Sequence, residues 1–225
     1  HMRWFESCQP PADVFVRSAA STLAGVAIAG PRSRELLQRL VRSDLSAGAF
    51  RLFHVLEIAV GLAPAILVRA GFTGELGYEI WTTPDYLLTL YEQLCDAGRD
   101  LELVHFGGRA LSSLRLEKGY GSFNKDFRPD YTAGETGLDR FIDFSKPEFI
   151  GRDAAFAERA AGAKRRFVVL EVDAADADVV GYESIIRKGE AVGYVTSGSY
   201  GHCVGKSLAA GYVPTDCVRD GEQLE

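Results

Sequence analysis

The 225-residue sequence lacks several patterns from which a function is most easily inferred. Its four cysteines form no CxxC pair and match no zinc-ligand spacing; they are Cys8, Cys95, Cys203 and Cys217. We therefore predict no metal site. We interpret the cysteines as thiols of a reduced, cytoplasmic protein.

Long apolar runs, repeats and an excess of positive charge are absent as well. No apolar run approaches the length of a membrane-spanning helix. A net charge of −6 argues against nucleic acid or an anionic membrane as a main partner. What remains is the composition of a globular protein, with 47% hydrophobic and 25% charged residues. This balance still permits a small anionic ligand held by a few local cations.

Hydrophobic periodicity predicts an α+β first part. Strands are expected in four segments, at 14–29, 50–60, 62–70 and 78–81. Helices are expected after Gly30-Pro31, after the capping hydroxyl of Thr83 and Pro84, and over about 106–118. In the third helix the inward-facing residues would be Ala110, Leu111 and Leu114. This alternation suggests a ferredoxin-like arrangement.

The character of the sequence changes near Gly151. A short helix is expected over 152–161. Four strand candidates separated by glycines follow it, at 167–172, 185–188, 191–196 and 207–213. They predict a small β-barrel or sandwich. We place the boundary near 150–163, which gives an α+β part over 1–155 and a C-terminal β-barrel domain over 156–225.

A glycine-rich run, RAGFTGELGYEI at 69–80, is the first candidate site. Its three glycines lie at intervals of three and permit a close approach of the backbone. In the strand that follows, Tyr78 and Ile80 share one face and Glu79 points to the other. A carboxylate beside such a loop can accept two parallel N–H bonds from one planar group. The alternative is a plain hairpin in which Glu79 is a solvated strand residue.

A second candidate lies at the end of the third helix, within 111–126. Arg115 and Lys118 are three residues apart, and Tyr120 follows the helix. Cations and an aromatic ring at a helix end can clamp and stack on a flat anionic ligand. The alternative is an intrahelical ion network of Arg115, Glu117 and Lys118, with Tyr120 packed at the helix end.

A third run, at 193–213, contains Gly-Lys-Ser but does not match a phosphate-binding loop. Three residues separate Gly201 from Gly205, where the Walker pattern needs four, and a strand-like segment follows the lysine. His202 and Cys203 are neighbours, so in a strand they would point to opposite sides. We therefore interpret His202 as a turn residue.

In their order and intervals, these runs resemble the aminomethyltransferase family, the glycine-cleavage T-proteins. The pterin-binding run of that family is glycine–aromatic–Thr–Gly–Glu–x–Gly–aromatic–Glu, as at 71–79. The segments 30–31, 114–117, 136–138 and 149–152 match as well. Within the family, 113–120 and 193–205 are most similar to the folate-binding domain of dimethylglycine and sarcosine dehydrogenases.

The resemblance implies a tetrahydrofolate-binding protein. Glu79 would bind the 2-amino-4-oxo edge of the pterin, and Phe72 and Tyr120 would line the folate. Arg109 and Arg115 are the cationic candidates.

Two departures from the family pattern affect this site. Phe72 stands where the family usually has tyrosine, so a hydroxyl contact is lost. Leu111 stands where the glycine-cleavage branch has arginine, and Arg109, two residues earlier, is the candidate to compensate.

The implied reaction is transfer of a methylene unit from an aminomethyl or iminium donor to tetrahydrofolate. The implied partners are folate, a small amine-derived donor, and a flavin dehydrogenase domain or a lipoyl carrier protein. Competing interpretations are a non-catalytic folate-binding module and a folate-dependent demethylase. The resemblance places the catalytic aspartate of the family before His1 and the last barrel strands after Glu225. It therefore implies an incomplete member of the three-part T-protein fold, inactive on its own.

Overall fold

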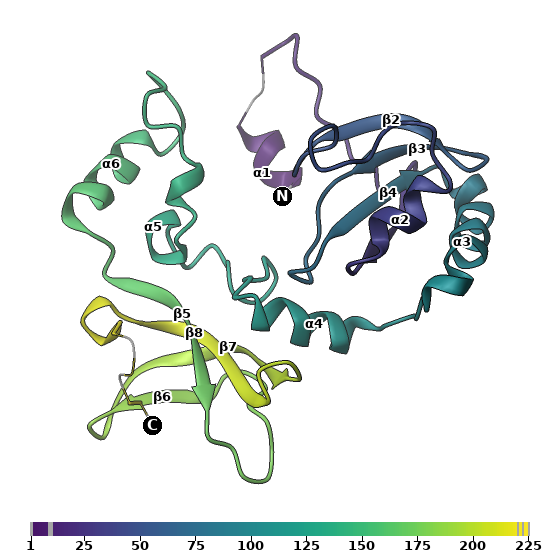
Figure 1. Cartoon of the computed structure of the whole chain (residues 1–225). Helices are drawn as coiled ribbons and strands as arrows, with labels where there is room; N and C mark the ends of the chain where they lie inside the picture. Colours follow the sequence, from purple (N-terminus) through teal and green to yellow (C-terminus); the bar gives the residue numbers. More distant parts are fainter. Residues whose placement is uncertain (1, 9–10, 220, 222, 225) are drawn as a thin grey trace. The chain divides into compact units, whose positions relative to one another are not determined.

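The computed structural model describes residues 2–8, 11–219, 221 and 223–224. The chain forms two compact units, His1–His105 and Phe106–Glu225, each with its own four-stranded sheet (Figure 1). Within the described residues, no helix is long and apolar enough to cross a bilayer.

The first unit is an antiparallel sheet with two of its helices, the second and third in the chain, packed on one face. The strands are β1 (Ala24–Ala29), β2 (Val55–Val60), β3 (Ala63–Val68) and β4 (Gly77–Thr82), in the order β1-β4-β3-β2. The helices are α1 (Met2–Ser7), α2 (Ser33–Gln38), α3 (Pro84–Gly98) and the 3₁₀ turn η1 (Arg99–Leu101). From β1 to α3 the order is β-α-β-β-β-α, with three consecutive strands where the ferredoxin-like order has two.

The core of this unit fills one face of the sheet. Leu36 and Leu37 of α2 and Leu90 of α3 are buried with Tyr78 and Ile80 of β4. Burying each such side chain contributes about 1.5–3 kcal/mol. Because strand residues alternate between faces, this packing leaves the residues between them, Glu79 among them, on the opposite face.

The second unit begins with helices and ends in a sheet. The helices are α4 (Gly108–Glu117), α5 (Ala133–Thr136) and α6 (Arg152–Ala161), with 3₁₀ turns η2 (Asp139–Phe141) and η3 (Thr215–Cys217). The strands are β5 (Arg165–Val172), β6 (Ser184–Arg187), β7 (Glu190–Gly201) and β8 (Lys206–Pro214), antiparallel in the order β5-β8-β7-β6. Helix α4 packs on β7 and β8, and α5 packs on β5.

The predicted fold class is confirmed: a mixed helix-and-sheet part precedes a C-terminal sheet. Helix α6 and strands β5 to β8 lie where the sequence predicts them. The expected boundary near 150–163 falls where helices give way to strands, and as a domain boundary it stays a prediction.

Three local expectations are wrong. Residues 14–23 form no strand, so that of the one or two strands expected over 14–29 the structure has β1 alone. Helix α3 begins at Pro84, where a helix start is expected, but Thr83 makes no side-chain capping bond. In α4 the buried residues are Ser113, Arg115 and Leu116, whereas the expected inward residues Ala110, Leu111 and Leu114 are exposed or half-buried.

The face of α4 differs from expectation because the helix is held partly by polar contacts. Ser113 Oγ donates to the carbonyl of Tyr200 on β7 at 2.5 Å. Arg115 makes a buried ion pair with Asp126. Hydrophobic periodicity alone cannot detect a helix face that buries a charge.

Candidate functional site

The glycines of the 69–80 run are required by its geometry. A Cβ on Gly77 would lie 2.9 Å from the Cα of Gly71, closer than real Cβ contacts allow. Gly74 adopts a left-handed φ of +83°, which a side chain would disfavour. The expected close approach of the backbone is therefore confirmed.

The glycine loop is also tied to the start of α2. The backbone N–H of Gly30 donates to the carbonyl of Leu76 at 2.8 Å. Ser33 Oγ, which is buried, lies 2.7 Å from the carbonyl of Gly30 and 3.0 Å from that of Leu76. The Gly30-Pro31 motif and the glycine run, about forty residues apart in the sequence, thus form one local structure.

Glu79 lies in β4, between β1 and β3, opposite to the buried Tyr78 and Ile80. Its side chain is half-buried, and Trp81 Nε1 donates to Glu79 Oε2 at 3.2 Å. In the described part of the chain this is the one hydrogen bond of the Glu79 carboxylate. The other oxygen is therefore available to a ligand, and Oε2 has a further lone pair.

The residues next to Glu79 on this face of the sheet are apolar, and several of them are small. Ala27 and Val68 are the register partners of Glu79 on the neighbouring strands. Trp81 lies against Gly25, where a Cβ would come within 2.9 Å of the indole ring. A carboxylate among such groups is partly removed from water, which strengthens a charge-assisted hydrogen bond to a ligand.

Phe72 and Glu75 occupy the same loop and differ from Glu79. The Phe72 side chain, at the loop surface, is 39% exposed. Glu75 is exposed within the turn, where its N–H donates to Thr73 Oγ1 at 3.3 Å. Glu79 is thus the carboxylate of this run that the sheet orients.

The other three predicted site residues belong to the second unit. Arg109 is exposed in the first turn of α4. Tyr120 follows the helix end and is 39% exposed, after Gly119 with a left-handed φ of +74°. The Tyr120 N–H donates to the carbonyl of Arg115 at 2.8 Å, which fixes where the aromatic residue leaves the helix.

Arg115 is almost fully buried, at 2% exposure, and pairs with Asp126 rather than with Glu117. Glu117 instead accepts hydrogen bonds from the N–H groups of Cys203 and Val204, at 2.6 and 3.1 Å. The alternative of an ion network within the helix is therefore wrong. A direct contact of Arg115 with folate stays a prediction.

Asp126 is a residue whose importance sequence reasoning missed. It is fully buried, and its carboxylate accepts hydrogen bonds from Arg115, the N–H of Ser122, Thr196 and Ser197. An aspartate in a loop after a helix is usually a surface residue. The signal that distinguishes it is tertiary, because two of its donors lie on β7.

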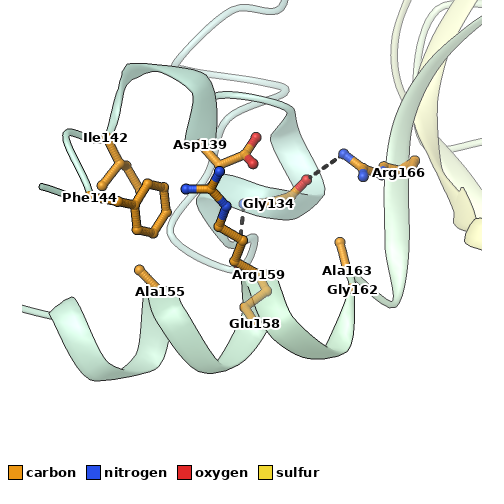
Figure 2. Close-up of a pocket in the computed structure, with 10 residues that line it drawn as sticks. All are labelled: Gly134, Asp139, Ile142, Phe144, Ala155, Glu158, Arg159, Gly162, Ala163 and Arg166. Atoms are coloured by element: carbon orange, nitrogen blue, oxygen red, sulfur yellow. Dashed lines mark hydrogen bonds between the residues drawn. The ribbon is translucent and has the colours of Figure 1, made fainter.

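A small pocket lies between α5, η2 and α6 (Figure 2). Its volume is about 80 Å³, well below the roughly 300 Å³ at which ligand pockets usually begin. The Arg159 guanidinium lies 4.4 Å from the Phe144 ring centre, and the N–H of Gly134 donates to Glu158 at 3.2 Å. None of the predicted folate-contacting residues lines this pocket.

Comparison with family models accounts for nearly the whole chain. Residues 1–146 match the GCVT N-terminal domain, and residues 165–225 match the glycine cleavage T-protein C-terminal barrel domain. The chain therefore belongs to the glycine-cleavage T-protein family.

The named relatives include dehydrogenases and aminomethyltransferases. Dimethylglycine dehydrogenase, mitochondrial, from Rattus norvegicus is 36% identical over 227 residues, covering 100% of this chain and 26% of the relative. An aminomethyltransferase from Caldanaerobacter subterraneus is 31% identical over 212 residues, 94% of this chain and 56% of the relative. The crystal structure of glycine cleavage system aminomethyltransferase T from Bartonella henselae superposes with a TM-score of 0.79 at 25% identity, over 90% of this chain and 54% of that one.

These coverages limit what the relatives imply. The chain spans about a quarter of the dehydrogenase and about half of each aminomethyltransferase. The dehydrogenase is named as mitochondrial, so the cytoplasmic location stays a prediction.

Proposed function

We propose that this chain is the tetrahydrofolate-binding part of an aminomethyltransferase-type protein that transfers a methylene unit from an aminomethyl or iminium donor to tetrahydrofolate. The observation that carries the proposal is Glu79: a half-buried carboxylate on an apolar sheet face, beside the glycine loop, with one oxygen unengaged by any described residue.

The chemistry of the pterin fits this carboxylate. The 2-amino group and N3–H of the pterin form a row of two donors, about as far apart as the two oxygens of a carboxylate. Glu79 can accept both, because the indole N–H of Trp81 occupies one lone pair of one oxygen. Trp81 also orients the carboxylate before the ligand arrives, which reduces the entropy lost on binding.

The remaining residues would contact the folate without taking part in bond making or breaking. Phe72 at the loop and Tyr120 after α4 are both part-exposed aromatic residues that can line a flat ring system. The Arg109 guanidinium is the exposed cation on α4 available to an anionic group of the folate. Positioning N5 and N10 of the folate towards the carbon donor is the contribution we assign to these residues.

We further propose that the chain works beside a flavin dehydrogenase domain or a lipoyl carrier protein, and that it does not catalyse methylene transfer on its own. The share of the relatives that it covers supports this. Robust methylene transfer by the purified chain would contradict this proposal.

Two measurements test the proposed function. Calorimetric titration of the chain with 5-formyltetrahydrofolate, a stable reduced folate, should show binding that Glu79→Gln weakens. The gene sequence upstream decides the chemistry. An aspartate-bearing segment would support transfer, and a preceding FAD domain with GxGxxG would support the dehydrogenase branch. If the upstream sequence contains neither of them, a non-catalytic folate-binding module is favoured.

A further inference from the structure

We infer that Arg115 and Asp126 are positioning residues, which hold the segment 119–124 so that Tyr120 faces the ligand, and that neither touches folate. This inference rests on the proposed function, because it assigns Tyr120 to the folate site. It also changes the role of Arg115 from a ligand-binding cation to a support of the residue that binds.

The charges of this pair are removed from water. Arg115 is 2% exposed and Asp126 is 0% exposed, with 2.6 Å between Nη1 and Oδ2. A hydrophobic pair of similar volume is often as stable as a buried ion pair. The pair is therefore explained better by specificity of structure than by stability alone.

The same two side chains hold the backbone on both sides of Gly121. Arg115 Nη1 donates to the carbonyl of Tyr120 at 2.8 Å, and the N–H of Ser122 donates to Asp126 Oδ2 at 2.7 Å. A Cβ at Gly121 would overlap the ring of Phe127. The main chain of Tyr120 is thus fixed by the core, while its side chain remains 39% exposed.

A β-bulge on β7 completes the support. The register between β7 and β8 shifts between Val195 and Ser197, which makes Thr196 an extra residue. Adjacent residues of a regular strand point to opposite faces. The bulge lets Thr196 Oγ1 and Ser197 Oγ both donate to Asp126 Oδ1, the latter at 2.7 Å.

Strand β8 anchors the backbone of the same aspartate. Tyr212 O–H donates to the Asp126 carbonyl at 2.8 Å. Each carboxylate oxygen of Asp126 thus faces a different structure: Oδ2 faces α4 and the Tyr120 segment, and Oδ1 faces the bulge. The aspartate links the sheet to the Tyr120 segment.

A neighbouring ion pair in the same unit provides a matched control. Arg165 Nε donates to Glu135 Oε1 at 2.9 Å, and Glu135 caps α5. Within the described residues, the other contacts of this pair, to Thr132 and to the ring of Tyr131, lie outside the segment 119–124. Weakening it should therefore lower stability without moving Tyr120.

A double-mutant cycle on the full chain tests the inference, with 5-formyltetrahydrofolate as the probe. Tyr120→Ala should weaken binding about two- to tenfold, the value of an aromatic contact. Asp126→Asn removes the negative charge opposite Arg115 and replaces one acceptor oxygen by an amide donor, and should weaken binding by a similar factor. The double mutant should lose no more than Tyr120→Ala alone. Glu135→Gln should leave affinity within about twofold.

Hydrogen exchange supplies a readout that needs no ligand. Asp126→Asn should speed amide exchange in 119–124 by about tenfold or more, because a hydrogen bond to a charged group contributes about 1.5–3 kcal/mol. Strands β5 to β8 should change much less. If Asp126→Asn does not fold, Ser197→Ala removes one donor to the same carboxylate and takes its place.

The outcomes separate the inference from the proposed function. Additive losses in the cycle, unchanged affinity in Asp126→Asn while Tyr120→Ala binds less, or a uniform rise in exchange would each overturn the inference. Absence of folate binding by the wild-type chain would overturn the proposed function and the inference that rests on it. Hydrogen exchange would then show whether the structural support of 119–124 exists without that role.

Discussion

The two units each carry a notable carboxylate, and the two differ in how far their hydrogen-bonding capacity is used. Asp126 in the second unit is fully buried and accepts from four donors. Glu79 in the first unit is half-buried and accepts from one donor among the residues that the structure describes. A saturated carboxylate has no capacity left for a ligand, whereas an oriented but unsaturated one does. The contrast distinguishes a carboxylate whose capacity is used within the fold from one that retains capacity for a ligand.

The largest effect that tests this contrast is on stability. Asp126→Ala should lower the free energy of unfolding by about 3–5 kcal/mol, because it leaves the Arg115 charge buried without a partner. Glu79→Ala should change it by roughly 0.5 kcal/mol or less, as for an ordinary surface substitution. Chemical denaturation of both variants measures the difference. Equal losses at the two positions would mean that Glu79 is also a structural residue.

The next largest effect is on folate affinity. Glu79→Ala or Glu79→Gln should weaken binding of a stable reduced folate about thirtyfold or more, since truncating a charge-assisted partner costs about 2–5 kcal/mol. Glutamine offers one acceptor and one donor to a row of two donors, so it cannot replace the glutamate.

Glu75→Gln is the matched control for that experiment. Glu75 lies in the same loop but is exposed within the turn. Its substitution should change affinity much less. Small and equal losses at Glu75 and Glu79, measured by calorimetry in a longer parent protein as well as in this chain, would reduce Glu79 to a solvated strand residue.

The sequence predicts the position of Glu79 better than the role of Asp126, for a physical reason. The glycine loop and the facing of Glu79 depend on residues within one short run, where glycine spacing and strand alternation act locally. Helix α6 and the strands after it are predicted for the same reason. The role of Asp126 depends on Thr196 and Ser197, some seventy residues away and brought together by a bulge. No local pattern encodes that contact.

The prediction of the buried face of α4 is wrong for the same reason. Ala110, Leu111 and Leu114 look like the apolar stripe of a helix, yet the helix buries Ser113 and Arg115. Their partners, the Tyr200 carbonyl and Asp126, are supplied by tertiary structure. The apolar segment 14–23 forms no strand, although its composition suggests one.

A smaller effect sharpens the account of Glu79 itself. Trp81→Phe removes the indole N–H that donates to Glu79 Oε2 and keeps an aromatic ring against Gly25. Loss of one hydrogen bond of this kind costs about 0.5–1.5 kcal/mol, so folate affinity should fall about two- to tenfold. The same calorimetric titration measures it. Unchanged affinity would show that the indole does not orient the carboxylate.

The smallest effect concerns a third carboxylate, Glu135. The number of hydrogen bonds that it accepts lies between those of Glu79 and Asp126. Burial alone would raise its pKa, but hydrogen bonds from Arg165 and from the Thr132 N–H outweigh burial and hold the pKa below the ordinary value of 4.5. A lowered folded-state pKa means that the unfolded chain binds the proton more readily. The pair therefore stabilises the fold above about pH 4.5, and this contribution is lost as the pH falls through the lower folded pKa.

The expected size is at most about 1 kcal/mol, because the Arg165 side chain is 44% exposed and solvent screens the pair. Denaturation curves recorded between about pH 6 and about pH 3 should show a smaller acid destabilisation in Glu135→Gln than in the wild type. Arg165→Gln should shift the same part of the curve, because it removes the group that lowers the pKa. An identical pH dependence in all three proteins would mean that the Glu135 carboxylate keeps the same pKa on unfolding and that the pair contributes no pH-dependent stability.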